Sequence, residues 1–261
     1  MKVVHGVEAL EPADGRLFVV VGVFDGLHVG HAYLLDELRK AAIQAGARPA
    51  VITFDHHPDE VIRGAAPPLL CDPEERLERL QMAGVEVTVV QTFDVALRMT
   101  PFEAFVRRIA DRVDLAGVLM TPESAFGHDR GGTPETVAAL GRTLGYDVVV
   151  VPQFELDGRP VRSSDIRAAI ATGDLREAEH LLGRPMSVVG EVSRALRDAT
   201  VLGFGLPVVL PPAGRYEAVV TSPGGAIRER TIEVDGTILQ ITPAIPARVG
   251  DRLVVSPRGP A

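Results

Sequence analysis

Cysteine and lysine are scarce in this chain of 261 residues, and long apolar runs are absent. The single cysteine, Cys71, excludes an internal disulfide framework. No stretch reaches the roughly eighteen apolar residues that indicate a membrane-spanning helix. The opening residues, MKVVHGVEALEPADG, lack the charged, apolar and small-residue regions of a signal peptide. These absences predict a cytoplasmic protein that has no membrane partner.

The charge balance is acidic, with a formal net charge of −8. Nucleic-acid binding generally needs a basic face that neutralises phosphates, so we expect no nucleic-acid partner. Nearly all basic residues are arginines, since Lys2 and Lys40 are the only lysines. A cationic contact to a phosphate group should therefore come from an arginine.

Short apolar runs rich in β-branched residues alternate with helical patterns along the first part of the chain. Because the hydrophobicity is continuous rather than alternating, each run predicts a strand covered on both faces, and together they predict an open parallel α/β sheet. The predicted strands are residues 16–23, 47–54, 85–93, 114–120 and 146–154. Helices are expected at 32–45 and 101–113, the second with Thr100 as its cap and Glu103 completing a capping box.

The composition changes after two short helical patterns at residues 163–173 and 174–185. From about Ser187 the chain is strand-like and rich in turns, which is typical of a small antiparallel barrel or sandwich. We therefore predict an α/β domain at residues 1–186 and a small β-barrel domain at residues 187–261.

The stretch VVVGVFDGLHVGHAYLLDELRK places His28 and His31 where the first predicted strand gives way to a helix. Gly22, Gly26 and Gly30 allow a close backbone approach to a ligand, and a helix N-terminus attracts anions. Imidazoles at such a turn can bind phosphoryl oxygens and, if protonated, stabilise charge at phosphorus. The residues alone also allow both histidines merely to cap or pack at the helix start. Neither GxxxxGK[ST] nor GxGxxG occurs, so P-loop and dinucleotide-dehydrogenase sites lack their phosphate binders.

The sequence GVFDGLHVGH resembles the HxGH signature of nucleotidyltransferases, and its FDG narrows the similarity to the prokaryotic FAD synthetase family. That family is the FMN adenylyltransferase module of bifunctional riboflavin kinase/FMN adenylyltransferase. Further segments resemble it in the same order: TFDHHP, the FG at Phe126 with Arg130, and RSSDIRAAIATGDLREAEHLLGRP. The resemblance covers about residues 16–190 and implies a Rossmann-like nucleotidyltransferase domain.

The resemblance also implies a reaction, in which AMP passes from ATP to FMN to give FAD and pyrophosphate, usually with Mg²⁺. We therefore expect ATP and FMN as partners, and the ligands of any metal are unknown. By position, the implied catalytic residues are His28, His31 and Arg167; the nucleotide-binding residues are Gly22, Phe24, Asp25, Gly30, Ser163 and Ser164; and the substrate-binding residues are Asp55, Glu123, Phe126 and Arg130.

Two features of the residues bear on these roles. Ser163 and Ser164 near a helix N-terminus, with Arg167 one turn later, have the pattern of an anion cradle for pyrophosphate, and a capped surface helix has the same pattern. In FDHHPDEV, the adjacent His56 and His57 point apart on an extended chain, so we predict no metal site there.

Several positions depart from the family pattern and leave the function open. Thr121 and Ser124 differ from it ahead of FG, with Ser124 in place of an aromatic residue, and Asp165 replaces a threonine beside the proposed cradle. FMN adenylyltransferase is the favoured function. The alternatives are a nucleotidyltransferase with another phosphate acceptor and a non-catalytic nucleotide or flavin regulator.

The C-terminal part resembles a shortened riboflavin kinase barrel. Where that family has Pro-Thr-Ala-Asn, this chain has Leu206, Pro207, Val208 and Val209, whose apolar side chains cannot coordinate Mg²⁺. Its short length predicts that the closing helix and the strands carrying the catalytic glutamate are missing, while Glu229 and Glu233 should face solvent. We predict no riboflavin kinase activity, and a barrel that packs over one side of the site or supports a homo-oligomer.

Overall fold

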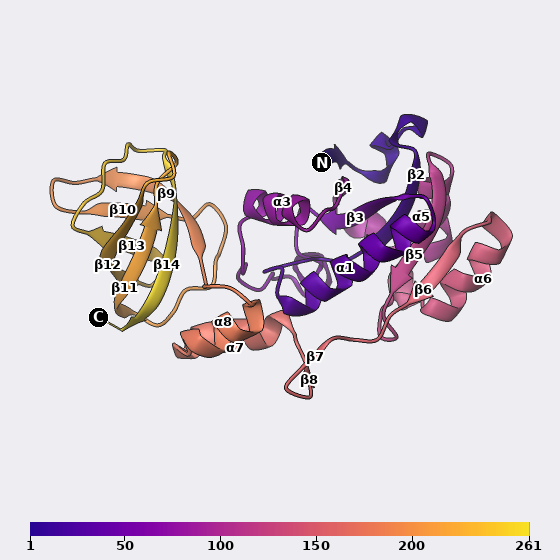
Figure 1. The fold of residues 1–261 in the computed structure, drawn as a ribbon. Coiled ribbons are helices and arrows are strands. Elements are labelled where there is room, and N and C mark those ends of the chain that lie inside the picture. The colour runs from indigo at the N-terminus through magenta and orange to yellow at the C-terminus, as the bar shows by residue number, and fades with distance from the viewer. Residues whose placement is uncertain (261) are drawn as a thin grey trace. The chain divides into compact units, whose positions relative to one another are not determined.

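The computed structural model describes residues 1–260, which divide into two compact units. The first contains Met1–Phe24, Gly30–Pro67 and Leu77–Pro160, and the second contains Asp25–Val29, Pro68–Arg76 and residues 161–260. The first holds a parallel α/β sheet and the second a closed antiparallel barrel, which confirms the predicted fold class (Figure 1). The division predicted after residue 186 remains a proposal.

The sheet of the first unit has the order β1-β4-β3-β2-β5-β6, and every neighbouring pair is parallel. Its strands are β1 (Lys2–His5), β2 (Arg16–Val21), β3 (Arg48–Phe54), β4 (Val87–Gln91), β5 (Asp114–Met120) and β6 (Asp147–Val150). The chain runs from central β2 outward through β3 and β4, then returns to β5 on the other side. The carboxyl ends of β2 and β5 therefore form a switch point, where open α/β sheets bind ligands.

The helices are α1 (Val29–Gln44), α2 (Pro58–Arg63), α3 (Pro73–Met82), α4 (Val95–Arg98), α5 (Phe102–Ala110), α6 (Pro134–Leu144), α7 (Ser163–Thr172) and α8 (Leu175–Leu182). Short 3-10 turns occur at Val7–Ala9, Pro12–Asp14 and His128–Arg130. None of the helices in the described part of the chain combines the length and the apolar character needed to cross a bilayer.

The predicted cap of α5 is wrong. Pro101 occupies the N-cap position, where no side chain accepts a capping hydrogen bond. The Thr100 hydroxyl instead donates to the carbonyl of Ala96 at 2.8 Å. The preceding short helix α4 therefore takes the hydroxyl that the sequence pattern assigned to α5.

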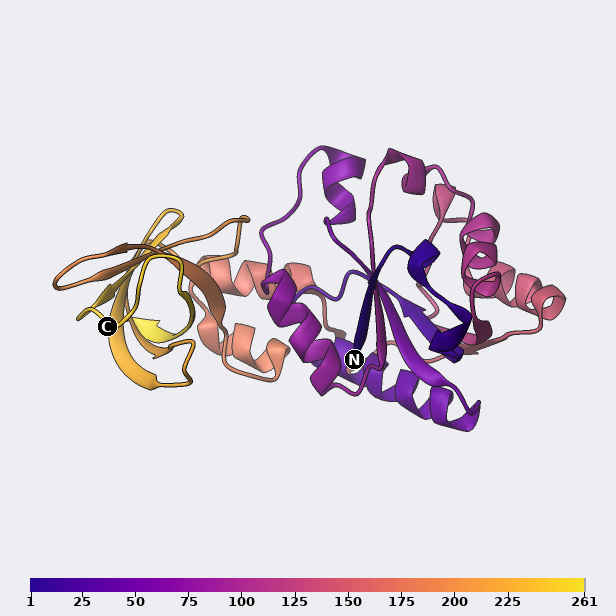
Figure 2. The same cartoon turned by 90° about the horizontal axis from the view of Figure 1, so that it is seen from above.

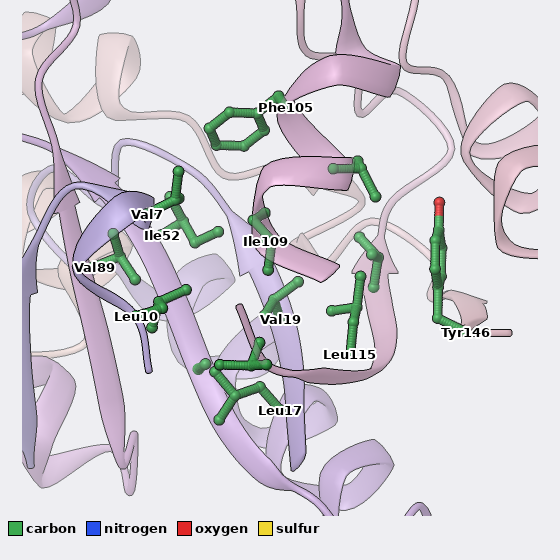
Figure 3. Close-up of a cluster of buried hydrophobic side chains, with 14 of the residues drawn as sticks. Val7, Leu10, Leu17, Val19, Ile52, Val89, Phe105, Ile109, Leu115 and Tyr146 are labelled. Carbon is green, nitrogen blue, oxygen red and sulfur yellow. The ribbon is translucent and has the colours of Figure 1, made fainter. Parts of the chain in front are cut away.

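The core of the first unit covers both faces of the sheet. On one face, Leu17 and Val19 of β2 share a hydrophobic cluster with Phe105 and Ile109 of α5 (Figure 3). Val137 of α6 belongs to the same cluster. α1 lies on the opposite side of the strands from α5 and α6 (Figure 2) and buries Leu35, Leu38 and Ala42. Coverage on both faces explains the continuous hydrophobic runs.

The barrel of the second unit closes in the order β10-β13-β12-β11-β14-β9. Its strands are β9 (Val188–Ala195), β10 (Thr200–Gly203), β11 (Gly214–Thr221), β12 (Ile227–Asp235), β13 (Ile238–Thr242) and β14 (Arg252–Pro260), while β7 (Glu155–Leu156) and β8 (Arg159–Pro160) form a small hairpin in the first unit. Inward residues such as Ile232, Ile241 and Leu253 are fully buried. Because the barrel is closed, it has no edge strand whose backbone groups lack a neighbouring strand.

Candidate active site

The loop after β2 has a strained backbone. Phe24 and Leu27 adopt φ values of 53° and 38°, in the left-handed region that side chains with a Cβ rarely occupy. Between them, Gly26 has φ 82°, and a Cβ at this position would lie 2.9 Å from the Leu70 side chain. Backbone strain of this kind persists only where the surrounding contacts impose it, and it clusters at functional sites.

Phe24 and His31 are two signature residues that lie in the first unit. Phe24 is 1% exposed, and its ring centroid is 5.1 Å from that of His31. The half-buried His31 imidazole is therefore oriented by an aromatic neighbour as well as by the first turn of α1. Gly22 leaves room for the same ring, because a Cβ there would lie 2.9 Å from it.

Asp25 is the centre of a buried polar network in the second unit. Its carboxylate accepts hydrogen bonds from the backbone N–H groups of Leu70 at 3.0 Å and Cys71 at 3.3 Å. Arg167 Nη2 donates to the same carboxylate at 2.5 Å, and Arg167 Nε donates to the carbonyl of Pro68 at 2.7 Å. The structure therefore shows Arg167 as the counter-ion of Asp25, and its predicted contact with pyrophosphate remains a proposal.

The two serines at the start of α7 have different surroundings. The half-buried Ser163 donates from its hydroxyl to the backbone carbonyl of Asp25 at 3.1 Å, so it ties α7 to the loop. Ser164 is exposed and donates to the carboxylate of exposed Asp165 at 3.2 Å. This contact occupies one oxygen of Asp165.

His28 lies in the second unit and is 5% exposed. Burial and then the positive charge of Arg184 lower the pKa of His28 from 6.5 to about 4. Arg184 also donates from Nη2 to the carbonyl of Gly26 at 2.8 Å. Sequence analysis missed Arg184 as a site residue, because it follows the end of α8 and no residue spacing links it to the histidines.

A cavity of about 500 Å³ lies at the switch point of the first unit. Segments after β2, β3, β4 and β5 all contribute to its wall, including Gly22, Phe54, Phe93 and Phe126. Gly127 closes one side with φ 77°, and a Cβ there would lie 2.6 Å from the backbone nitrogen of Phe102. An apolar wall with a few polar groups is typical of small-molecule sites of this size.

Comparison with known proteins supplies the family. Residues 10–165 match the model of the FAD synthetase family. The chain belongs to the FAD synthetase family.

Curated relatives of this family member carry the name bifunctional riboflavin kinase/FMN adenylyltransferase. The protein from Pseudomonas fluorescens is 30% identical over 204 residues, which cover 78% of this chain and 66% of the relative. The protein from Haemophilus influenzae is 28% identical, with 78% and 67% covered. The matches thus span about two thirds of the length of these relatives.

A crystal structure of a macrolide-efflux protein from Streptococcus pneumoniae shares the fold. Its TM-score is 0.83 at 21% identity, and the likeness covers 100% of this chain and 91% of that one. At this identity the likeness concerns the fold alone.

The predicted substrate residues of this FAD synthetase family member are dispersed. Phe126 and Arg130 line the cavity, whereas Glu123 is exposed and its backbone carbonyl accepts a hydrogen bond from Arg130. Asp55 lies outside the described cavity lining, and its carboxylate accepts hydrogen bonds from Thr92, Phe93 and His56. These contacts help to hold the pKa of Asp55 below its usual value. The substrate roles of all four residues remain proposals.

Other motif residues have structural partners. Thr121 and Ser124 share hydrogen bonds of 2.9 Å within a turn after β5. His57 caps α2 by accepting a hydrogen bond from the backbone N–H of Asp59. Burial raises the pKa of Cys71 to about 12, so its thiol stays protonated at neutral pH.

Proposed function

We propose that this protein is an FMN adenylyltransferase, which transfers AMP from ATP to FMN and releases pyrophosphate. Family membership supports the nucleotidyl-transfer reaction. The observation that carries the choice of acceptor is the cavity at the switch point, with Phe54, Phe93 and Phe126 in its wall. Aromatic side chains offer an isoalloxazine ring stacking and edge contacts.

Polar groups near this wall complement a phosphorylated flavin. Arg98 and Arg130 line the cavity, together with His57 and His128. Arginine forks suit the ribityl phosphate and the carbonyl edge of a flavin, because they donate several hydrogen bonds in one plane. An apolar wall with cationic neighbours thus suits an aromatic substrate that carries an anionic tail.

The proposed reaction is an in-line displacement at the α-phosphorus of ATP. An oxygen of the FMN phosphate forms the new bond to phosphorus, and the bond between that phosphorus and the bridging oxygen of pyrophosphate breaks. No covalent enzyme intermediate is needed, so the protein aligns the reactants and stabilises charge. His28 and His31 are the proposed donors to the reacting phosphates.

The protonation state of His28 fits this role. With a pKa of about 4, the imidazole is neutral at pH 7 in the free protein and offers one N–H donor. An incoming triphosphate places negative charge nearby, which favours the protonated imidazole. On this proposal, the binding of ATP raises the pKa of His28.

Mg²⁺ is proposed to enter with ATP rather than to be held by the protein. The described residues contain no group of three or more His, Cys, Asp or Glu side chains that could bind a metal ion. The Asp25 carboxylate is already engaged by Arg167 and two backbone N–H groups. Mg²⁺ commonly binds through substrate phosphates and water with few protein ligands, so this arrangement suffices for a metal–ATP substrate.

We further propose that the chain does not phosphorylate riboflavin. Val208 forms a β-bridge with Leu69, and Val209 is 7% exposed, so this loop packs against protein. Glu229 and Glu233 are exposed, as expected, and Glu229 pairs with Arg258. None of these groups is placed as a phosphate ligand or a buried base.

A single assay tests both proposals. The protein is incubated with ATP and Mg²⁺ and, separately, with FMN, nicotinamide mononucleotide, phosphopantetheine or riboflavin, while pyrophosphate release and chromatography follow the products. FMN should give FAD and pyrophosphate, and riboflavin should give no FMN. Pyrophosphate release with another acceptor only would replace FMN as the substrate, and its absence with every acceptor would favour a non-catalytic binding protein.

A further inference from the structure

One segment of the second unit contacts both the barrel and the loop that carries His28. We call this segment, Pro68–Arg76, the brace. Toward the loop, its Leu70 and Cys71 N–H groups donate to the carboxylate of Asp25. Cys71 Sγ accepts a hydrogen bond from the backbone N–H of Gly26 at 3.3 Å. The brace therefore fixes the loop immediately before His28 through both a side chain and the backbone.

Toward the barrel, the brace pairs with the connection between β10 and β11. Leu69 donates from its backbone N–H to the carbonyl of Pro207 at 2.8 Å, and Val209 donates to the carbonyl of Leu69 at 3.0 Å. Leu69 and Val208 form a parallel bridge. Backbone pairing fixes both position and direction, because each N–H and C=O must meet its partner. The bridge uses the apolar residues that depart from the kinase pattern.

Side chains add two further ties between the brace and the barrel. Arg252 of β14 forms ion pairs with Asp72 at 2.5 Å and with Glu74. Ser187 donates to Glu75 Oε1 at 3.2 Å, and both residues are 8% exposed. Exposed ion pairs are screened by water and contribute little, so the backbone bridge and the buried hydrogen bond should contribute more.

We propose that the barrel positions the His28 loop for adenylyl transfer: its Leu206–Val209 segment and Arg252 hold the brace, and the brace holds Asp25 and Gly26. The catalytic consequence rests on the proposed function. Leu69, Val209 and Arg252 are positioning residues, since they act through the brace. Misplacement of a reacting group by about 1 Å can lower a rate roughly 100-fold, so a remote support can affect turnover. A barrel without kinase chemistry thereby serves the other reaction.

The test loosens the brace in the full-length chain. Leu69→Pro removes the N–H that donates to Pro207, and Arg252→Ala removes the ion pairs. Val209→Pro removes the reciprocal donor and serves if the first variant does not fold. Arg258→Ala is the matched control, because Arg258 also lies on β14 but forms an exposed ion pair at 3.1 Å with Glu229 of β12, away from the brace. Circular dichroism verifies that each variant is folded.

The first readout is the titration of His28, followed by NMR of its imidazole protons without substrate. The parent and the control should titrate near pH 4, whereas the pKa in the Leu69→Pro/Arg252→Ala variant should move toward 6.5 because a loosened loop admits water. The second readout is steady-state FAD formation. The double variant should lose about 10-fold or more in kcat. Its KM for FMN should not change, because the proposed FMN cavity lies in the first unit.

The two readouts separate this proposal from the proposed function. An unchanged His28 pKa in the folded variants overturns the positioning role, whatever their activity. An equal pKa shift in Arg258→Ala also overturns it, because that change leaves the brace intact. A parent chain that makes no FAD overturns the proposed function alone, since the titration requires neither substrate.

Discussion

The cavity of the first unit and the brace of the second unit use their polar groups in opposite ways. At the cavity, Arg98, Arg130 and His128 line a space of about 500 Å³ that is large enough for a small molecule. Around the brace, a smaller hollow of about 190 Å³ is lined by Leu69, Val208 and other residues, and its acidic side chains pair with Arg252. Arg98 and Arg130 each donate to one backbone carbonyl, of Val61 and Glu123, yet they border a ligand-sized space. The acidic side chains of the brace meet Arg252 beside a much smaller hollow.

This difference shows how a ligand-binding site can be distinguished from a structural contact between two segments. Resemblance alone does not separate the two regions, because both lie in segments that resemble enzymes acting on phosphates. The destinations of the hydrogen bonds separate them. An arginine that meets one carbonyl keeps other N–H donors for a ligand, whereas a backbone N–H that has met its partner has none left. The predictions below test this distinction.

The largest expected effect concerns Arg167, for which the resemblance implies a ligand contact and the structure shows an ion pair with Asp25. Arg167→Ala leaves the buried Asp25 carboxylate without its cation and should lower the free energy of unfolding by about 3–5 kcal/mol. Arg167→Lys should restore only part of this, because lysine cannot reproduce both contacts of a planar fork. Urea unfolding measures both, with Arg162→Ala at the exposed N-cap of α7 as the control.

The opposite result would be equally informative. If Arg167→Ala unfolds with the parental free energy but binds ATP more weakly by calorimetry, the Asp25 pair does not support the fold. Arg167 would then belong to the ligand-directed groups, as the resemblance implies.

The next effect concerns His31 and should appear in turnover. His31→Ala should cost about 2–4 kcal/mol of transition-state stabilisation, the range for loss of a preorganised donor. The loss of stability should be smaller, although the contact with the Phe24 ring also disappears. Steady-state FAD formation and thermal unfolding measure the two effects. His5→Ala, on the exposed part of β1, is the control. Parental turnover in a folded His31→Ala variant would remove this residue from the mechanism.

A third prediction uses the pH dependence of stability. The unfolded chain protonates His28 near pH 6.5, whereas the folded chain does so only near pH 4. Between these values the unfolded state binds more protons, so the free energy of unfolding should fall as the pH is lowered, by about 3 kcal/mol over the window. At pH 6.5 and above this contribution is fully present.

Urea titrations at several pH values between 7 and 4 measure this slope. His28→Gln should remove it, and the difference from the parent cancels the contributions of carboxyl groups that titrate in the same range. Equal slopes in parent and variant would show that His28 is hydrated in the folded protein.

The first unit was largely predictable from local patterns. A strand covered on both faces requires a continuous apolar run, so all five predicted strands occur; the strand predicted at 114–120 has those bounds, and the other four are shorter than predicted. The edge strand β1 was missed because it spans four residues and buries only Val4. α1 starts at Val29 rather than at the predicted Ala32, so Gly30 and His31 lie in its first turn.

The contacts of the site were less predictable, because they join distant parts of the chain. Asp25 and Arg167 each lie in a recognisable motif, but the sequence does not indicate that these two residues, 142 positions apart, form an ion pair. The brace meets Asp25 across 45 positions, and its residues carry no catalytic motif. Arg184 was missed for the same reason. Local sequence therefore indicated which residues matter, and tertiary packing decided what each contacts.

The smallest expected effect concerns the barrel glutamates, and it tests whether the barrel retains phosphate chemistry. Glu229 is exposed and forms an ion pair with Arg258, while Glu233 is exposed on the same strand, β12. Glu229→Gln and Glu233→Gln should each change the free energy of unfolding by less than about 0.5 kcal/mol, as is usual for surface substitutions. FAD formation from FMN should be unchanged, because neither residue contacts the brace or the loop. With riboflavin, ATP and Mg²⁺, the parent and both variants should give no FMN by chromatography. FMN formation by the parent that is lost in either variant would identify a catalytic base on β12, and the barrel would then carry phosphate chemistry of its own beside that proposed for the first unit and the His28 loop.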